Sequence, residues 1–147
     1  MMKVRLVNMI SYLLIFLFIY ASISKLLDYE KFRVQIGQSP LLTTMSDFVV
    51  WFIPLAEVVI SVLLVFSRSR LAGLYLAFGL MTLFSAYIIA ILNFGVFVPC
   101  SCGGILQNMT WDTHLIFNLF FVLICIIAIY LEALVQAGNR HYTSQTI

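Results

Sequence analysis

The stretch LAGLYLAFGLMTLFSAYIIAILNFGVF, residues 71–97, decides the fold of this chain. It contains no charged residue, and a helix of about 20 apolar residues already crosses a hydrocarbon core roughly 30 Å thick. Three other long stretches are mostly apolar as well: residues 6–27, 48–66 and 111–134. The sequence therefore predicts an all-α fold, an integral membrane four-helix bundle that forms a single membrane domain over residues 1–147. Gly73 and Gly79 are expected to let neighbouring helices approach closely in lipid.

The composition of the chain is that of a membrane protein. Hydrophobic residues make up 63% of the 147 residues and charged residues only 10%, whereas a soluble domain is about 25% charged. The mean hydropathy is +1.10. The net charge of +2 is small, and the basic residues are scattered between apolar stretches. We therefore expect the lipid bilayer to be a partner and exclude nucleic acid.

The positions of Lys and Arg predict the orientation of the helices, because short cytoplasmic segments carry more basic residues. Five basic residues fall on one side of the predicted bundle, namely Lys3, Arg5, Arg68, Arg70 and Arg140. Three fall on the other side, namely Lys25, Lys31 and Arg33. We expect a bacterial inner-membrane protein with both termini in the cytoplasm and with residues 98–110 in the periplasm. The alternative, that the first apolar stretch is a signal peptide, is disfavoured because this stretch is longer than a usual signal core.

A short helix is expected between the first two apolar stretches. Asp28 is a suitable N-cap, and Tyr29, Phe32 and Ile36 would share one face of a helix that Gly37 then ends. Such an amphipathic segment favours an interfacial helix in the first outer loop. The alternative is a plain connecting loop.

Two cysteines follow the third apolar stretch in VPCSCGG, residues 98–104. A disulfide between Cys100 and Cys102 would close a small, strained ring, and strained, exposed disulfides exchange readily. Facing an oxidising compartment, the two residues are predicted to form a catalytic redox pair, and His114 is a candidate for activating one thiol. The alternatives are a static loop disulfide, half of a metal site and thiols without a role. No metal is expected, since His114 is the only nearby histidine. Cys125 is expected to be a small buried hydrophobe.

A carboxylate stands deep within the second apolar stretch. Glu57 is costly there unless it is paired or neutral, and Lys25 is expected at a comparable depth in the first stretch. The sequence therefore predicts a contact between Lys25 and Glu57, with Asn118 nearby as a hydrogen-bond partner. One hypothesis is a purely structural polar clamp. The other is a proton path or the polar wall of a site for a quinone, the one cofactor that we consider.

Five short motifs make the chain resemble the MauE branch of the DoxX-like membrane proteins over almost its whole length. They are Ala21-x3-Lys25-Leu-x-Asp28, Ser39-Pro-Leu-Leu42, Pro54-x2-Glu57, Pro99-Cys-Ser-Cys-Gly-Gly104 and Trp111-x2-His114-x3-Asn118. The resemblance implies a four-helix membrane protein of methylamine utilisation, needed for making the disulfide-rich small subunit of methylamine dehydrogenase alongside a thioredoxin-like partner. The layout is more loosely similar to membrane thiol oxidoreductases of the DsbB and vitamin K epoxide reductase types, whose second cysteine pair this chain lacks.

Two functions of different classes follow from these observations. The first is thiol-disulfide exchange through Cys100 and Cys102 with a periplasmic thioredoxin-like protein, in support of the maturation of exported proteins. The second is a non-catalytic membrane subunit or assembly factor in which the cysteines form a structural disulfide. The sequence leaves open whether the protein is an enzyme; the enzyme hypothesis is a thiol-disulfide oxidoreductase.

Overall fold

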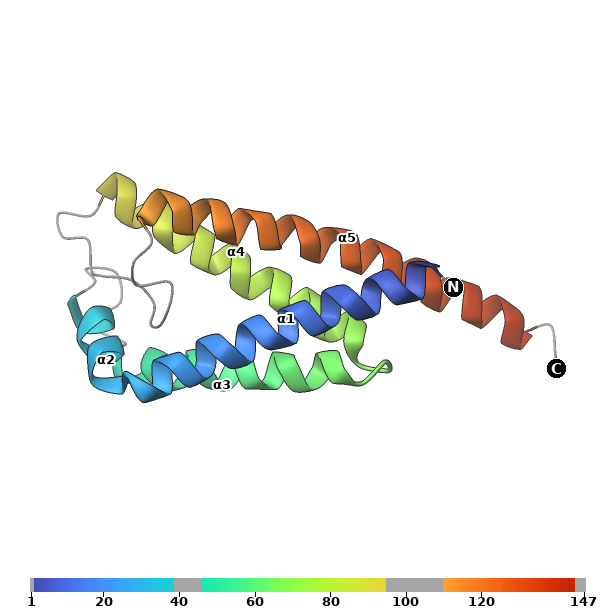
Figure 1. Ribbon diagram of the computed structural model, residues 1–147, viewed down its shortest axis with the longest axis horizontal. Coiled ribbons are helices and arrows are strands. Elements are labelled where there is room, and N and C mark those ends of the chain that lie inside the picture. The colour runs from blue at the N-terminus through green and yellow to red at the C-terminus, as the bar shows by residue number, and fades with distance from the viewer. Residues whose placement is uncertain (1, 39–45, 95–109, 145–147) are drawn as a thin grey trace.

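The structure, a computed structural model, describes residues 2–38, 46–94 and 110–144. Its helices are α1 (Met2–Leu27), α2 (Tyr29–Gln38), α3 (Ser46–Val65), α4 (Arg70–Phe94) and α5 (Trp111–Ser144). The four long helices alternate in direction and form a bundle, and the short α2 lies at one end of it (Figure 1). The predicted all-α four-helix bundle with a short helix after the first long one is therefore confirmed.

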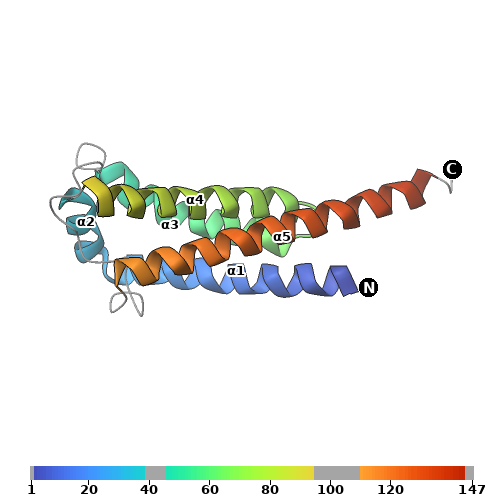
Figure 2. The ribbon, with the colours of Figure 1, turned by 90° about the horizontal axis from the view of Figure 1, so that it is seen from above.

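Four helices are long and apolar enough to cross a membrane: Met2–Leu27, Ser46–Val65, Arg70–Asn93 and Asp112–Gly138. The last helix is longer than the predicted stretch, because α5 continues past Leu134 to Ser144 and projects beyond the rest of the bundle (Figure 2). Residues 135–144 contain no proline, and a helix tolerates the single Gly138. Arg140, treated above as a residue flanking the span, therefore lies on a helical extension.

The bundle carries apolar side chains on its outside and polar side chains within it. Phe16, Leu83 and Leu123 are among many large apolar residues that are exposed. Among the residues that the structure describes, the buried polar ones are Ser11, Ser22, Lys25, Glu57, Ser61, Ser85, His114, Asn118 and Glu132. A helix bundle in water exposes mainly polar side chains, whereas lipid solvates apolar surface at no cost. The chain is thus a multi-pass membrane protein whose outer surface contacts the bilayer.

Each long helix packs on two others, α1 and α4 both lying against α3 and α5. Leu14, Phe18 and Leu74 are buried in the shared core. Cys125 is buried in the same core, as the sequence predicted.

The turn between α3 and α4 depends on one glycine. A Cβ atom at Gly73 would lie 3.1 Å from the Leu63 Cβ atom and 3.1 Å from the Leu64 backbone nitrogen, so α4 approaches α3 closely only because Gly73 has no side chain. A Cβ atom at Gly79 would meet no described atom within 4 Å. The expectation of a close approach is confirmed at Gly73 and wrong at Gly79.

The short helix α2 packs its apolar side on α3. Phe32 and Ile36 are buried against Val50, and the ring centroids of Tyr29 and Trp51 lie 5.5 Å apart. The face that Tyr29, Phe32 and Ile36 were predicted to share is therefore the face that packs. Its position at the membrane interface remains a prediction.

Candidate functional site

The cysteine pair lies outside the described residues, as does the whole VPCSCGG motif. Along the chain this motif stands between Phe94, where α4 ends, and Trp111, where α5 begins. Both helix ends lie at the end of the bundle that carries α2 (Figure 1). The other predicted site residues are all described and all buried: Lys25, Glu57, His114 and Asn118.

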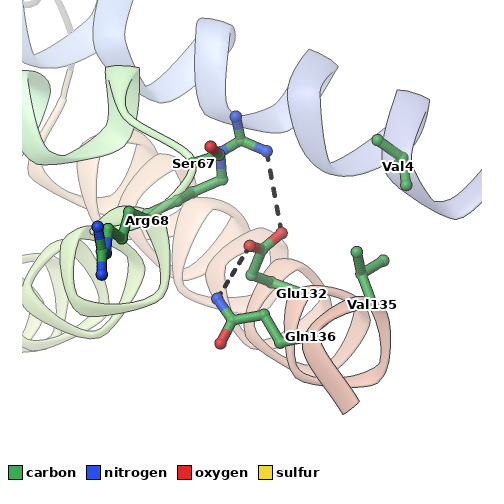
Figure 3. A pocket seen from close by; sticks show the side chains of 7 residues that line it. Val4, Ser67, Arg68, Glu132, Val135 and Gln136 are labelled. Carbon is green, nitrogen blue, oxygen red and sulfur yellow. Dashed lines mark hydrogen bonds and ion pairs between the residues drawn. The ribbon is translucent and has the colours of Figure 1, made fainter. Parts of the chain in front are cut away.

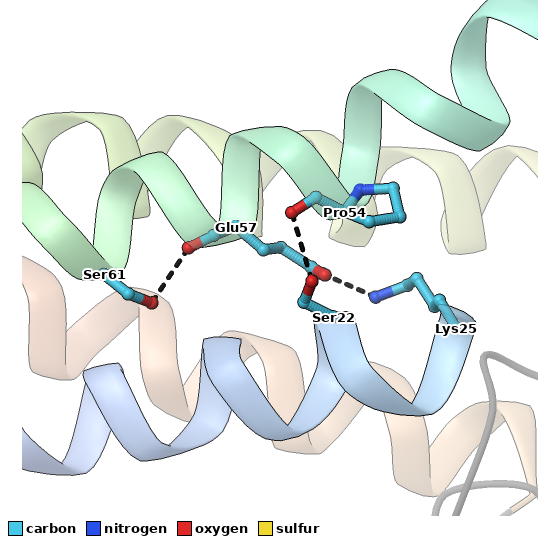
Figure 4. A network of polar contacts seen from close by, with 5 residues as sticks. All are labelled: Ser22, Lys25, Pro54, Glu57 and Ser61. Atoms are coloured by element: carbon cyan, nitrogen blue, oxygen red, sulfur yellow. Dashed lines mark hydrogen bonds and ion pairs between the residues drawn. The ribbon is translucent and has the colours of Figure 1, made fainter. Parts of the chain in front are cut away.

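Lys25 and Glu57 form an ion pair inside the bundle. Lys25 Nζ, in the last turn of α1, donates to Glu57 Oε1 of α3 over 2.5 Å (Figure 4). The two side chains are only 4% and 1% exposed. Two charges so far from water persist only because each compensates the other.

Two serine hydroxyls hold the backbone around this pair. Pro54 stands inside α3 and has no N–H group, so its ring interrupts the helical hydrogen bonds one turn ahead of Glu57. Ser22 Oγ of α1 donates to the Pro54 carbonyl oxygen over 3.2 Å, and Ser61 Oγ donates to the Glu57 carbonyl oxygen over 2.9 Å (Figure 4). The interruption in α3 is thereby tied to α1 at the level of the ion pair.

The remaining two helices complete the surroundings of the Lys25 ammonium. Its Nζ atom lies 5.7 Å from the centroid of the Phe84 ring on α4, a distance at which a cation is attracted to an aromatic face. His114 of α5 is close enough to Lys25 to interact with it electrostatically. Asn118 follows one turn later on the same side of α5 and is also buried. We call Lys25, Glu57, His114 and Asn118 the buried polar cluster.

The buried polar cluster has unused hydrogen-bonding capacity. Glu57 Oε2 and Asn118 Nδ2 are buried and find no hydrogen-bond partner among the described residues. One is an acceptor and the other a donor, and buried polar atoms of this kind are normally satisfied by a ligand or by water. The two atoms are therefore available to bind a water molecule or a polar group of a ligand. The described residues include no group of three or more His, Cys, Asp or Glu side chains that could hold a metal ion.

A second polar cluster, at the opposite end of the bundle, was missed by the sequence analysis. Arg70 Nη1 of α4 donates to Asn8 Oδ1 of α1 over 2.7 Å and lies 3.9 Å from Glu132 Oε2 of α5. Gln136 Nε2 donates to Glu132 Oε1 over 3.2 Å. The available signal was Glu132 itself, because a carboxylate inside an apolar stretch needs a partner.

Comparison with known proteins identifies the family. No curated protein and no solved structure matches the chain. The family model of the methylamine utilisation protein MauE matches residues 3–131, a range that takes in the ion pair, the cysteine motif and Asn118. Since this match covers most of the 147 residues, the chain belongs to the MauE family of membrane proteins.

Proposed function

We propose that this MauE-family membrane protein performs thiol-disulfide exchange through Cys100 and Cys102 with an exported thioredoxin-like protein, and so supports the maturation of exported proteins. The observation that carries the proposal is the buried polar cluster. Its residues His114 and Asn118 lie on the first turns of α5, which begins at Trp111, a few residues after the cysteine motif. The helix ends that flank the motif, at Phe94 and Trp111, lie at the end of the bundle near which the unused polar groups are buried.

The exchange follows from the chemistry of two neighbouring thiols. In the oxidising direction, a thiolate of the partner attacks the Cys100–Cys102 disulfide, forms a mixed disulfide and releases the other cysteine as a thiolate. The partner's second thiolate then attacks the mixed disulfide, so the partner leaves oxidised and the pair is left reduced. Two electrons and two protons have passed from the partner to the pair. The reverse sequence reduces the partner.

A quinone is the proposed acceptor that restores the disulfide of the pair. When bound, it would supply an acceptor for the two electrons and two protons that are released as the pair forms its disulfide. Asn118 Nδ2 is a buried donor suited to a quinone carbonyl, and Glu57 Oε2 is a buried acceptor suited to a hydroquinone hydroxyl. The Lys25 ammonium beside Glu57 would offer a positive charge next to a hydroquinone bound there.

We also propose the orientation that this function requires: the inner membrane of a bacterium, both termini in the cytoplasm and the cysteine motif in the periplasm. In support, Met2 and the C-terminal part of α5 lie at the end of the bundle opposite α2 (Figure 1). Alkaline phosphatase fused after residue 104 should be active, and a fusion after residue 147 should be inactive. The reverse pattern would overturn the orientation and with it the periplasmic chemistry.

The decisive experiment traps the partner. In a Cys125→Ser background, Cys100→Ser and Cys102→Ser are expressed singly in cells, and extracts are run without reductant. One of the two variants should accumulate a mixed disulfide with a thioredoxin-like protein, and the Cys100→Ser/Cys102→Ser double variant serves as the control that cannot. If neither single variant traps a partner and the redox state of the native pair never changes, the exchange function is wrong.

A second function, that of a non-catalytic subunit or assembly factor, is favoured by the clamp that Lys25, Glu57 and Ser22 form between α1 and α3. Under this function the double cysteine variant should support full maturation of exported proteins and show only a lower stability. Under the exchange function it should support none.

A further inference from the structure

A pocket of about 440 Å³ opens at the end of the bundle opposite the buried polar cluster. It lies between the start of α1, the turn from α3 to α4 and the second half of α5 (Figure 3). Its polar lining consists of Ser67, Arg68, Arg70, Glu132 and Gln136. The proposed exchange function uses none of these residues.

The charges in this pocket do not cancel. Two arginines, Arg68 and Arg70, and one carboxylate, that of Glu132, line it. Glu132 is already engaged, with Oε1 accepting from Gln136 and Oε2 facing Arg70. One positive charge is therefore left over in the lining. A ligand with a single negative charge would make the pocket neutral.

The two arginines differ in how they are held. The Arg70 side chain is 14% exposed and is fixed by Asn8 and Glu132, while its buried Nε has no hydrogen-bond partner among the described residues. Arg68 is exposed, points away from Glu132 (Figure 3) and forms no ion pair with another described residue. The pocket thus combines a fixed guanidinium with an adjustable one, and guanidinium forks match phosphate oxygens well.

The surroundings of the pocket indicate where its ligand comes from. Arg70 is the first residue of one candidate membrane span, and Glu132 lies near the end of another, which finishes at Gly138. Val4 and Val135 form apolar walls, and the neighbouring Leu6 and Leu134 expose their side chains outward. A molecule bound here would have its charged group at the head-group level of the bilayer and apolar chains along α1 and α5.

We propose that this pocket binds the singly charged phosphodiester head group of an anionic phospholipid, with phosphatidylglycerol as the representative. Arg68 closes onto one phosphate oxygen, and Arg70 together with the Ser67 hydroxyl faces the others. The bound lipid connects α1, α4 and α5 at the end of the bundle where α5 projects.

The test uses the purified full-length protein in an uncharged detergent. Phosphatidylglycerol, zwitterionic phosphatidylcholine and inorganic phosphate are titrated separately, with thermal stability and native mass spectrometry as readouts. Phosphatidylglycerol should bind and raise the melting temperature, and phosphatidylcholine should do so far more weakly. Arg68→Gln should weaken phosphatidylglycerol binding about tenfold, the loss expected for one charge-assisted hydrogen bond. Arg68 is chosen over Arg70 because removing Arg70 would also break the contacts with Asn8 and Glu132.

Arg5→Gln is the matched control, because Arg5 is an exposed basic residue on α1 near the same end of the bundle and does not line the pocket. It should leave the affinity unchanged. Equal weakening by Arg5→Gln and Arg68→Gln would mean general surface attraction and would overturn the site. Binding of inorganic phosphate without binding of phosphatidylglycerol would overturn the lipid as the ligand. Competition by inorganic phosphate that depends on Arg68 would support phosphate recognition.

Discussion

Lys25 and Glu57, 32 residues apart in the chain, meet inside the bundle with Lys25 Nζ 2.5 Å from Glu57 Oε1. The contact joins α1 to α3 directly below the end of the bundle that carries α2. Because neither side chain reaches water, each charge depends on the other for its compensation. The pair is therefore a stability determinant whether or not it also takes part in chemistry.

Replacing Glu57 alone should be strongly destabilising. Glu57→Gln leaves the Lys25 ammonium buried without a counter-charge, which costs about 3 kcal/mol or more. The Lys25→Met/Glu57→Gln double variant should recover much of this loss, because no charge is left unpaired. Reversible unfolding in mixed detergent micelles measures both values. The Arg33→Gln variant is a suitable control, since its exposed ion pair with Asp47, 3.4 Å long, should contribute little.

The same double variant separates the two roles of the pair. If the pair is only a clamp, a stable Lys25→Met/Glu57→Gln protein should still oxidise its partner at the native rate. If the buried polar cluster serves the quinone, the double variant should be folded but slow to regain its disulfide. A double variant as unstable as Glu57→Gln alone would contradict the unpaired Lys25 ammonium as the cause of the loss in stability.

Gly73 should tolerate no side chain. Gly73→Ala places a methyl group 3.1 Å from backbone and side-chain atoms of Leu63 and Leu64, and overpacking of this kind costs about 1–3 kcal/mol. Gly79→Ala adds the same methyl group on the same helix where no described atom lies within 4 Å. It should cause no loss. Equal thermal stability of the two variants would contradict the close approach of α4 to α3 at Gly73.

The Ser22 hydroxyl should contribute measurably to the contact between α1 and α3. Ser22→Ala removes its hydrogen bond to the Pro54 carbonyl oxygen, a loss of about 1 kcal/mol. Ser24→Ala is the matched control, since Ser24 is less buried and its side chain makes no hydrogen bond to another described residue. The difference between the unfolding free energies of the two variants measures the bond. Equal unfolding free energies would mean that a water molecule replaces this hydrogen bond without loss of stability.

Much of the fold could be predicted because a bilayer imposes a simple rule on length and polarity. Residues 71–97 are too long and too apolar for any other environment, and the charge inside the second apolar stretch demanded a partner of opposite sign at a similar depth. The residues of α2 that would share a buried face also followed from helical periodicity alone. The position where α5 ends did not, since no proline or pair of glycines marks it.

The site was less accessible to such reasoning, because packing decides which polar groups meet. Arg70 counted as a marker of topology, and only the arrangement of three helices shows that it contacts Asn8 and approaches Glu132. Gly73 and Gly79 look equivalent in the sequence, yet only one of them faces another helix. Likewise, the sequence offered Asn118 as a hydrogen-bond partner, whereas the structure leaves its amide nitrogen without one among the described residues.

Replacing Asn118 distinguishes most clearly between a structural role and a ligand-binding role of the buried polar cluster. Because its buried Nδ2 donates to no described residue, Asn118→Leu exchanges an unsatisfied amide for an apolar side chain of similar volume, and stability should be unchanged or slightly higher. If the amide holds a quinone carbonyl, the same variant should bind quinone about tenfold more weakly, as judged by reoxidation of the reduced cysteine pair at increasing quinone concentration. Phe120→Leu, two residues further along the same helix and exposed, should change neither quantity. A loss of stability without a change in quinone affinity would instead assign Asn118 to the clamp.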